Sequence, residues 1–236
     1  MFFLVFYCFC ELAYSFVIYR MYFESTLGDR MGRYTGPKNR IARRFGENIF
    51  GRKRNPLVHR PTPPGVHGAR RRKKSDFGLQ LNEKQKLKAV YGMLREKQLK
   101  RYYQHAVRRK ENTGTVLIQS LECRLDNIVY RLKLAPTIFA AQQLVAHGHV
   151  QVDGKKVDIR SFQVKPGMLV SIREKSRNMA IIKEALENSQ RTVPEYLNLE
   201  ANNFSGTLMA LPEIESIDFP VEINVPVICD FLAHTS

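Results

Sequence analysis

The 236-residue sequence contains no tryptophan and only four cysteines. Cys8 and Cys10 lie in an apolar N-terminal segment, whereas Cys123 and Cys229 stand alone and far apart. Because no Cys-x-x-Cys pair is present, the sequence supports neither a zinc knuckle nor a disulfide framework. We therefore expect a reduced, intracellular protein that holds no metal and no cofactor.

Acidic residues are scarce between positions 33 and 110, where 24 Lys and Arg face only four acids. Residues 111–236 hold 12 bases and 15 acids, so one third of the chain supplies more than the whole net charge of +16. A region of this charge density repels itself and needs a polyanion to become compact. Nucleic acid is the favoured partner, because each neutralised phosphate releases condensed counterions. For the run 70–74 alone, a solvated tail or a nuclear-import signal is the alternative.

Only one long apolar run is present, at residues 1–19, where Glu11 and Ser15 are the clearly polar positions. The run is nearly long enough to cross a bilayer, but it lacks the basic start and the cleavage site of a secretory signal. One hypothesis is a membrane anchor. The favoured one is that translation begins at Met31, with Met21 second, because the composition turns abruptly from apolar to basic there.

The segment 124–157 predicts two helices followed by a β-hairpin. The first helix follows an apolar stripe at helical spacing, formed by Leu117, Leu121, Leu125, Ile128 and Leu132. Pro136 marks the end of this helix, and Thr137 is expected to cap a second one that ends near Gly148. Alternating polarity from Val150 leads into Asp153-Gly154, a strong hairpin signal. The unit is too small to enclose a substrate, so we expect it to present a binding surface.

Two basic helices are predicted ahead of this unit. Asn82 is expected to cap the first, which runs through Lys88 with its lysines outward and is interrupted at Gly92. The second spans residues 95–110. Its Tyr102 and Tyr103 suit either stacking on unpaired bases or packing in the core, and the helical spacing favours core packing.

Two sites invite a catalytic or metal interpretation. Arg124-Leu125-Asp126 looks like the catalytic motif of pseudouridine synthases, but it lies in a helical pattern without the Gly-rich strand context. We expect Asp126 to pair with Arg124 or Arg131 instead. His147 and His149 have no acid or cysteine at ligand spacing, so we expect them to meet RNA or the backbone.

The C-terminal stretch, residues 184–236, carries nine acids and one base. Such a segment does not suit RNA binding and fits a basic protein neighbour better. Alternation over residues 221–225 predicts a strand there.

Several motifs occur in a fixed order from Met31 onward: MGRYTGPKNRIARR, PPGVHGARRRKKSDFGLQLNEKQKLK, LECRLDNIVYRL, QLVAHGHVQVDGKKVD and SIREKSRN. On these motifs, about 206 residues resemble the bacterial-type small-subunit ribosomal protein number four, the S-four family. The resemblance implies a cytoplasmic, ribosome-bound protein without enzymatic activity. Such a protein binds small-subunit ribosomal RNA (rRNA) early, nucleates assembly of the subunit body and contributes to decoding accuracy. The alternatives are an RNA-modifying enzyme with the same module and a membrane-tethered RNA binder.

We therefore predict an α+β fold divided into four segments. Residues 1–30 form the apolar extension, and residues 31–120 a basic domain whose first part, to about residue 80, is irregular. Residues 121–184 hold the helix-helix-hairpin RNA-binding module that gives the family its name. Residues 185–236 form an acidic segment that packs on the N-terminal domain or on a protein neighbour.

The expected rRNA contacts are Arg33, Lys38, Arg40, Arg43, Arg44, Lys84, Lys86, Arg124, Arg131, His147, His149, Lys155 and Lys156. By resemblance, Arg70, Arg71 and Lys73 face incoming messenger RNA (mRNA), and the C-terminal region lies against small-subunit protein number five.

The sequence departs from the family at two places. Asn39 and Ala42 stand where relatives often have zinc-binding cysteines, so the sequence resembles the zinc-free branch. Ile138 and Gln142 stand where Arg is common, and Ala140 where Glu is common, which predicts a weaker RNA contact on the second helix of the module.

Overall fold

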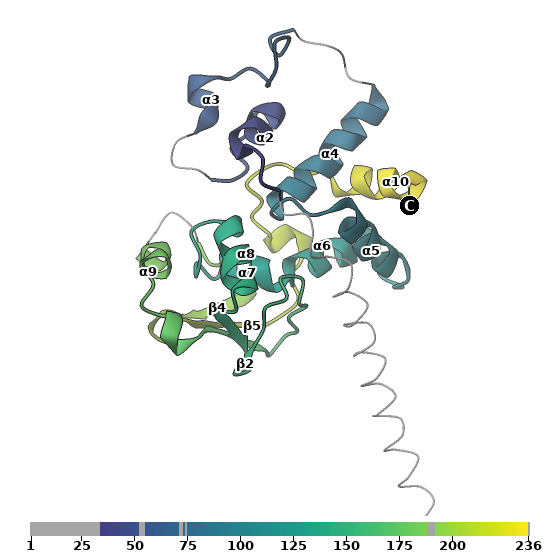
Figure 1. Cartoon of the computed structure of the whole chain (residues 1–236). Helices are drawn as coiled ribbons and strands as arrows, with labels where there is room; N and C mark the ends of the chain where they lie inside the picture. The colour runs from purple at the N-terminus through teal and green to yellow at the C-terminus, as the bar shows by residue number, and fades with distance from the viewer. Residues whose placement is uncertain (1–33, 52–54, 71–72, 74, 188–191, 236) are drawn as a thin grey trace, which may run out of the picture. The chain divides into compact units, whose positions relative to one another are not determined.

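The computed structural model describes residues 34–51, 55–70, 73, 75–187 and 192–235. The chain divides into two units, Met1–Gly36 and Pro37–Ser236. Every element named below belongs to the second unit (Figure 1). The predictions on residues 1–30, both the anchor and the internal start, lie outside the described residues. None of the described helices combines the length and the apolar character needed to cross a membrane.

Four helices from the two ends of this unit pack together: α4 (Asp76–Val90), α5 (Glu96–Val107), α6 (Thr113–Glu122) and α10 (Val225–Thr235). Helix α10 closes the chain and lies against α4, α5 and α6 (Figure 1). Leu87, Leu99, Leu117 and Ile228 are fully buried between them. This packing places the C-terminal helix on the basic N-terminal part of the chain.

A five-stranded antiparallel sheet in the order β2-β1-β3-β5-β4 forms the second half. Its strands are β1 (Val150–Val152), β2 (Lys155–Lys156), β3 (Leu169–Ile172), β4 (Leu197–Glu200) and β5 (Ser205–Leu208). Helices α7 (Leu125–Arg131) and α8 (Ile138–Ala146) belong to the same core. Further along the chain are α9 (Ala180–Glu187) and the short helices η1 (Glu174–Ser176), η2 (Ala201–Asn203) and η3 (Ile214–Ser216). The predicted α+β class is confirmed, and β4 and β5 extend the sheet beyond residue 184.

The predicted hairpin is confirmed between β1 and β2. Asp153 and Gly154 have φ angles of 48° and 76°, the left-handed pair of a tight two-residue turn. The Asp153 carboxylate also accepts a hydrogen bond of 2.9 Å from the backbone N–H of Leu169, which ties the turn to β3. The predicted cap of α8 is confirmed as well, because the Thr137 hydroxyl accepts from the Ala140 N–H.

The single helix predicted from the stripe ending at Leu132 is wrong: the stripe is split between α6 and α7. All five residues of the stripe are buried, so the direction of the apolar face was correct. The break falls at Cys123 and Arg124, whose backbone pairs with a later segment. The Cys123 carbonyl accepts from Val164 N–H, and Leu125 N–H donates to the Phe162 carbonyl. These bonds replace the helical ones, which sequence periodicity cannot register.

The predicted irregular extension contains two helices, α2 (Lys38–Phe45) and α3 (Pro56–His59). Gly46 ends α2 with φ of 75° and donates its N–H to the Ala42 carbonyl. Ile49 and Phe50 form a small apolar cluster with Ala89 of α4. These apolar residues pack the end of α2 and the residues after it against α4.

One predicted helix start and one predicted strand are also wrong. Helix α4 begins at Asp76 rather than after Asn82, because the Ser75 hydroxyl caps it by accepting from Gly78 N–H. Its predicted interruption is confirmed, since Gly92 has φ of 70° and α5 starts at Glu96. Residues 221–225 form no strand. Asn224 instead accepts from Val227 N–H and caps the first turn of α10.

Candidate RNA-binding surface

Helix α2 carries four of the predicted basic residues: Lys38, Arg40, Arg43 and Arg44. Ala42 is buried against the rest of the fold, whereas Arg40 and Arg44 are exposed. The Lys38 ammonium lies 3.6 Å from the ring centroid of Phe139, a cation–π contact that fixes its position. The helix thus presents a basic face that carries no acidic residue.

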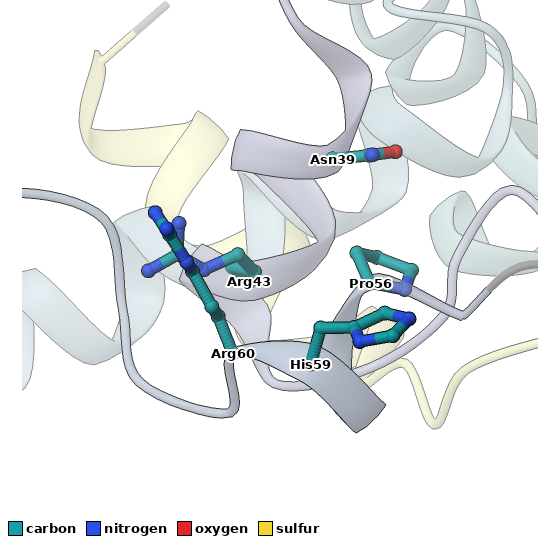
Figure 2. A pocket seen from close by; sticks show the side chains of 5 residues that line it. All are labelled: Asn39, Arg43, Pro56, His59 and Arg60. Carbon is teal, nitrogen blue, oxygen red and sulfur yellow. The ribbon is translucent and has the colours of Figure 1, made fainter.

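A cavity of about 250 Å³ lies between α2 and α3, lined by Asn39, Arg43, Pro56, His59 and Arg60 (Figure 2). The Arg43 guanidinium donates to the backbone carbonyl of Thr62 at 3.0 Å, so its orientation is set. No acidic residue lines this cavity, and Arg43 and Arg60 add positive charge beside it. Sequence reasoning missed His59 and Arg60, because α3 itself was not predicted.

The helix-to-strand corner after α8 gathers a second group, which we call the module corner: His147, His149, Lys155, Lys156 and Arg173. The Lys156 stem crosses Gly148 so closely that a Cβ there would lie 2.2 Å from Lys156 Cε. His149 Nδ1 lies 2.9 Å from the Ser176 hydroxyl, and the Arg173 guanidinium donates to the Gly148 carbonyl at 3.3 Å. His147, Lys155 and Lys156 are exposed. Arg173 was not predicted, although the SIREKSRN motif contained the signal.

Arg124 is buried and therefore does not belong to a surface. Its guanidinium forms two bonds, of 3.0 and 2.8 Å, with the carboxylate of Asp126, and a third with the Tyr102 hydroxyl. Burial alone would lower the pKa of Arg124, but the charge of Asp126 and these bonds raise it above the ordinary value. The predicted phosphate contact by Arg124 is corrected, since only 3% of the residue is exposed. Asp126 is as deeply buried, so a nucleobase cannot reach it as the enzyme hypothesis requires.

Arg131 is likewise engaged inside the chain. Its guanidinium donates to the buried carboxylate of Glu122 at 3.0 Å and to the Asp218 carbonyl at 2.8 Å. The hydroxyls of Tyr91 and Tyr196 donate to the same carboxylate. Burial and the charge of Glu122 raise the pKa of both tyrosines, which keeps their hydroxyls protonated as donors. Arg131 is thus partly buried and engaged with Glu122 and Asp218, and its contact with rRNA stays a prediction.

The lysines of α4 are committed to ion pairs rather than turned outward. Lys84, only 6% exposed, and Lys88 both contact the carboxylate of Glu96, at 2.6 and 2.8 Å. Lys86 pairs with Glu83 at 3.1 Å. Lys84 and Lys86 therefore do not point outward as expected, and their contact with rRNA stays a prediction.

Two of the three departures from the family pattern in α8, Ile138 and Gln142, fall on buried positions, whereas Ala140 is partly exposed. Ile138 is 5% exposed, and Gln142 is 7% exposed. The Gln142 amide donates to the carbonyl of Gly92 and to the carboxylate of Asp126, at 3.1 and 3.3 Å. Ile138 and Gln142 are thus packed inside the fold, and the weaker RNA contact of this helix stays a prediction.

The remaining residues that were predicted to contact RNA fall into two groups, those that the structure describes and those that it does not. Arg70 and Lys73 are exposed, whereas Arg33 and Arg71 lie outside the described residues. Tyr103 is buried in the core, as predicted.

Comparison with known proteins identifies the family of this chain. Residues 33–122 match the ribosomal protein S4/S9 N-terminal domain, and residues 123–170 match the S4 domain. Small ribosomal subunit protein uS4 of Protochlamydia amoebophila is 69% identical over 206 residues, which is 87% of this chain and all of that protein. The corresponding protein of Chlamydia muridarum is 60% identical over 207 residues, 86% of this chain and 99% of its own. The resemblance seen in the sequence motifs is confirmed, and the chain belongs to the family of small ribosomal subunit protein uS4.

Proposed function

We propose that this chain is a structural, non-enzymatic protein of the cytoplasmic small ribosomal subunit that binds its rRNA directly. Early binding would nucleate assembly of the subunit body. The observation that carries the proposal is the exposure of basic side chains on α2 and at the module corner. Their charge is presented to solvent, whereas Arg124, Arg131 and Lys84 are used inside the fold.

Equilibrium binding to the five-prime domain of small-subunit rRNA tests this function. A clamp of six to ten phosphates loses about 10³ to 10⁵ in affinity between 50 and 200 mM salt. A flat salt response would contradict the proposal. We expect Arg40→Gln/Arg44→Gln and Lys155→Gln/Lys156→Gln each to weaken binding and flatten the salt dependence. The control Lys165→Gln/Lys183→Gln removes the same charge from exposed positions elsewhere.

We further propose that Arg70, Arg71 and Lys73 face incoming mRNA, as the family resemblance implies. The exposure of Arg70 and Lys73 supports this role. Reconstituted subunits carrying Arg70→Gln/Lys73→Gln should translate an mRNA with a stable hairpin more slowly, and an unstructured mRNA at the normal rate. Equal slowing of both templates would contradict a role at the mRNA path.

The acidic C-terminal part is proposed to face small-subunit protein number five and so to influence decoding accuracy. Glu195, Glu200 and Glu213 are exposed there, as a contact with a basic neighbour requires. Charge reversal at Glu195 and Glu200 should raise misreading in a reporter assay while rRNA affinity stays normal. Unchanged misreading would reject this part of the proposal.

A further inference from the structure

The segment of residues 61–70, which we call the turn segment, folds back on itself just ahead of the basic run. Gly65 has φ of 109°, and its carbonyl accepts a hydrogen bond of 3.2 Å from the Gly68 N–H. The Arg70 N–H donates to the His67 carbonyl at 3.1 Å. Two consecutive turns therefore lead directly into Arg70, the first of the residues that we propose to face mRNA.

Gly68 lies directly against the backbone of Pro63. A Cβ at Gly68 would lie 2.0 Å from the Pro63 carbonyl oxygen, so only a glycine allows the two backbones to come this close. The Pro63 carbonyl thus sets the position of Gly68 and, through the second turn, the position of Arg70.

The Arg43 side chain of α2 holds this carbonyl. Its Nε donates to the Thr62 carbonyl at 3.0 Å, and its Nη2 donates to the Pro63 carbonyl at 3.4 Å. The guanidinium group is planar and presents its N–H donors in a fixed fork. One side chain therefore fixes two consecutive carbonyls of the turn segment.

The two ends of this connection differ in how they are packed. Helix α2 is attached to the fold, because Ala42 is only 1% exposed and the residues after the helix pack against α4. The turn segment contributes little to a core, since most of its side chains are exposed: Pro61, Thr62, Pro63, Val66 and His67. Exposed segments with few packed side chains open easily. The bonds from Arg43 thus join an exposed segment to a packed helix.

We propose that Arg43 is a positioning residue, which holds the turn segment against α2 and so sets where Arg70 and Lys73 meet mRNA. The inference rests on the proposed role of these two residues at the mRNA path. A segment that is held in place before binding loses less conformational freedom when it binds. Arg43 therefore acts on mRNA through the turn segment, without touching it.

The variant Arg43→Lys tests the fork separately from the charge. Lysine keeps the positive charge, but its single ammonium group cannot reproduce two donors in a fixed fork. In hydrogen exchange on the full chain without RNA, the Arg70 amide should exchange about fivefold faster than in wild type, the effect of one net hydrogen bond. Arg109→Lys makes the same substitution at an exposed position elsewhere and should keep the wild-type rate. An unchanged rate at Arg70 in Arg43→Lys would overturn the inference.

Reconstituted subunits connect this positioning with function. Arg43→Lys subunits should translate the hairpin mRNA more slowly and the unstructured mRNA at the normal rate, as expected for Arg70→Gln/Lys73→Gln. The salt dependence of rRNA binding should stay that of wild type, because the charge is kept. Circular dichroism establishes that the variants fold alike.

The outcomes separate this inference from the proposed function. If Arg70→Gln/Lys73→Gln slows the hairpin template and Arg43→Lys does not, the inference is rejected and the mRNA role stands. If Arg70→Gln/Lys73→Gln leaves the hairpin template unaffected, the mRNA role is rejected and the inference falls with it. An altered salt dependence in Arg43→Lys would also overturn the inference, since Arg43 would then act by a direct contact with RNA.

Discussion

The Arg131 guanidinium meets the Glu122 carboxylate at 3.0 Å in a site where the glutamate side chain is wholly inaccessible to solvent. Tyr91, at the end of α4, and Tyr196, next to β4, donate to the same carboxylate at 2.7 and 3.1 Å. Asn127 of α7 donates to it as well. One buried anion thus connects the N-terminal helices with the module and the C-terminal strands.

Removal of either partner of this pair should destabilise the protein strongly. We expect Arg131→Met to lower the free energy of unfolding by about 3 to 5 kcal/mol, because Glu122 is left charged and buried. Urea denaturation measures the change. The double variant Glu122→Gln/Arg131→Met should recover part of the loss, and a double variant less stable than Arg131→Met alone would contradict an ion pair as the cause.

Arg124 and Lys155 should show opposite effects. Arg124→Met is expected to cost about 3 to 5 kcal/mol of stability, since Asp126 would lose its buried partner. Below its unfolding transition, this variant should retain the wild-type salt slope for rRNA. Lys155→Met, at an exposed position, should reduce the slope and leave stability unchanged. Stability comes from urea denaturation and the slope from binding titrations. An altered salt slope in the folded Arg124→Met protein would mean that Arg124 contributes to RNA binding after all.

Two glycines with similar backbone angles form a matched pair for the module corner. Gly154 has φ of 76° and open space where a Cβ would stand, whereas a Cβ on Gly148, with φ of 71°, would strike the Lys156 stem. Alanine at either position should lower the free energy of unfolding by about 1 to 2 kcal/mol, because a residue with a Cβ disfavours the left-handed backbone conformation. Only Gly148→Ala should also weaken rRNA binding, because it displaces Lys156. Equal rRNA affinity of the two variants in titrations at one salt concentration would contradict a role for this corner.

Acidic pH should remove the contribution of Glu96 to the stability of the fold. Partial burial opposes ionisation of Glu96, but the bonds from Lys84 and Lys88 outweigh it and lower its pKa. A free Glu titrates near pH 4.3. The ion pairs therefore stabilise the fold above about pH 4.3, and this contribution is lost as pH falls through the lower pKa of the folded state.

We accordingly expect Glu96→Gln to melt at a lower temperature than wild type at pH 7 and at the same temperature at about pH 2. At pH 7, the free energy of unfolding of Glu96→Gln should differ from that of wild type by no more than about 1 kcal/mol, because the Glu96 side chain remains 39% exposed. Glu111→Gln, at an exposed position, is the control and should match wild type at both values. A Glu96→Gln difference that persists at about pH 2 would point to packing rather than charge.

Local signals in the sequence predicted local structure well. The Asp153-Gly154 turn and the Thr137 cap are confirmed, because each depends on a few consecutive residues. The apolar stripe predicted the buried face, but not the break at Arg124 that pairing with residues 162–164 imposes. For the candidate site, basic residues on α2 were found from charge and Arg173 stood in a motif already noted, whereas Arg60 became evident only from the fold.

The family, the α+β class and the concentration of positive charge in one third of the chain follow from composition and motif order alone. Which basic side chains are free to bind RNA depends on how the chain packs. Arg131 and Lys84 lie near acids that folding brings in, Arg124 pairs with the nearby Asp126, and burial of a charge requires such a partner. Lys97, Arg101 and Arg108 meet no such acid among the described residues, and their charge stays at the surface.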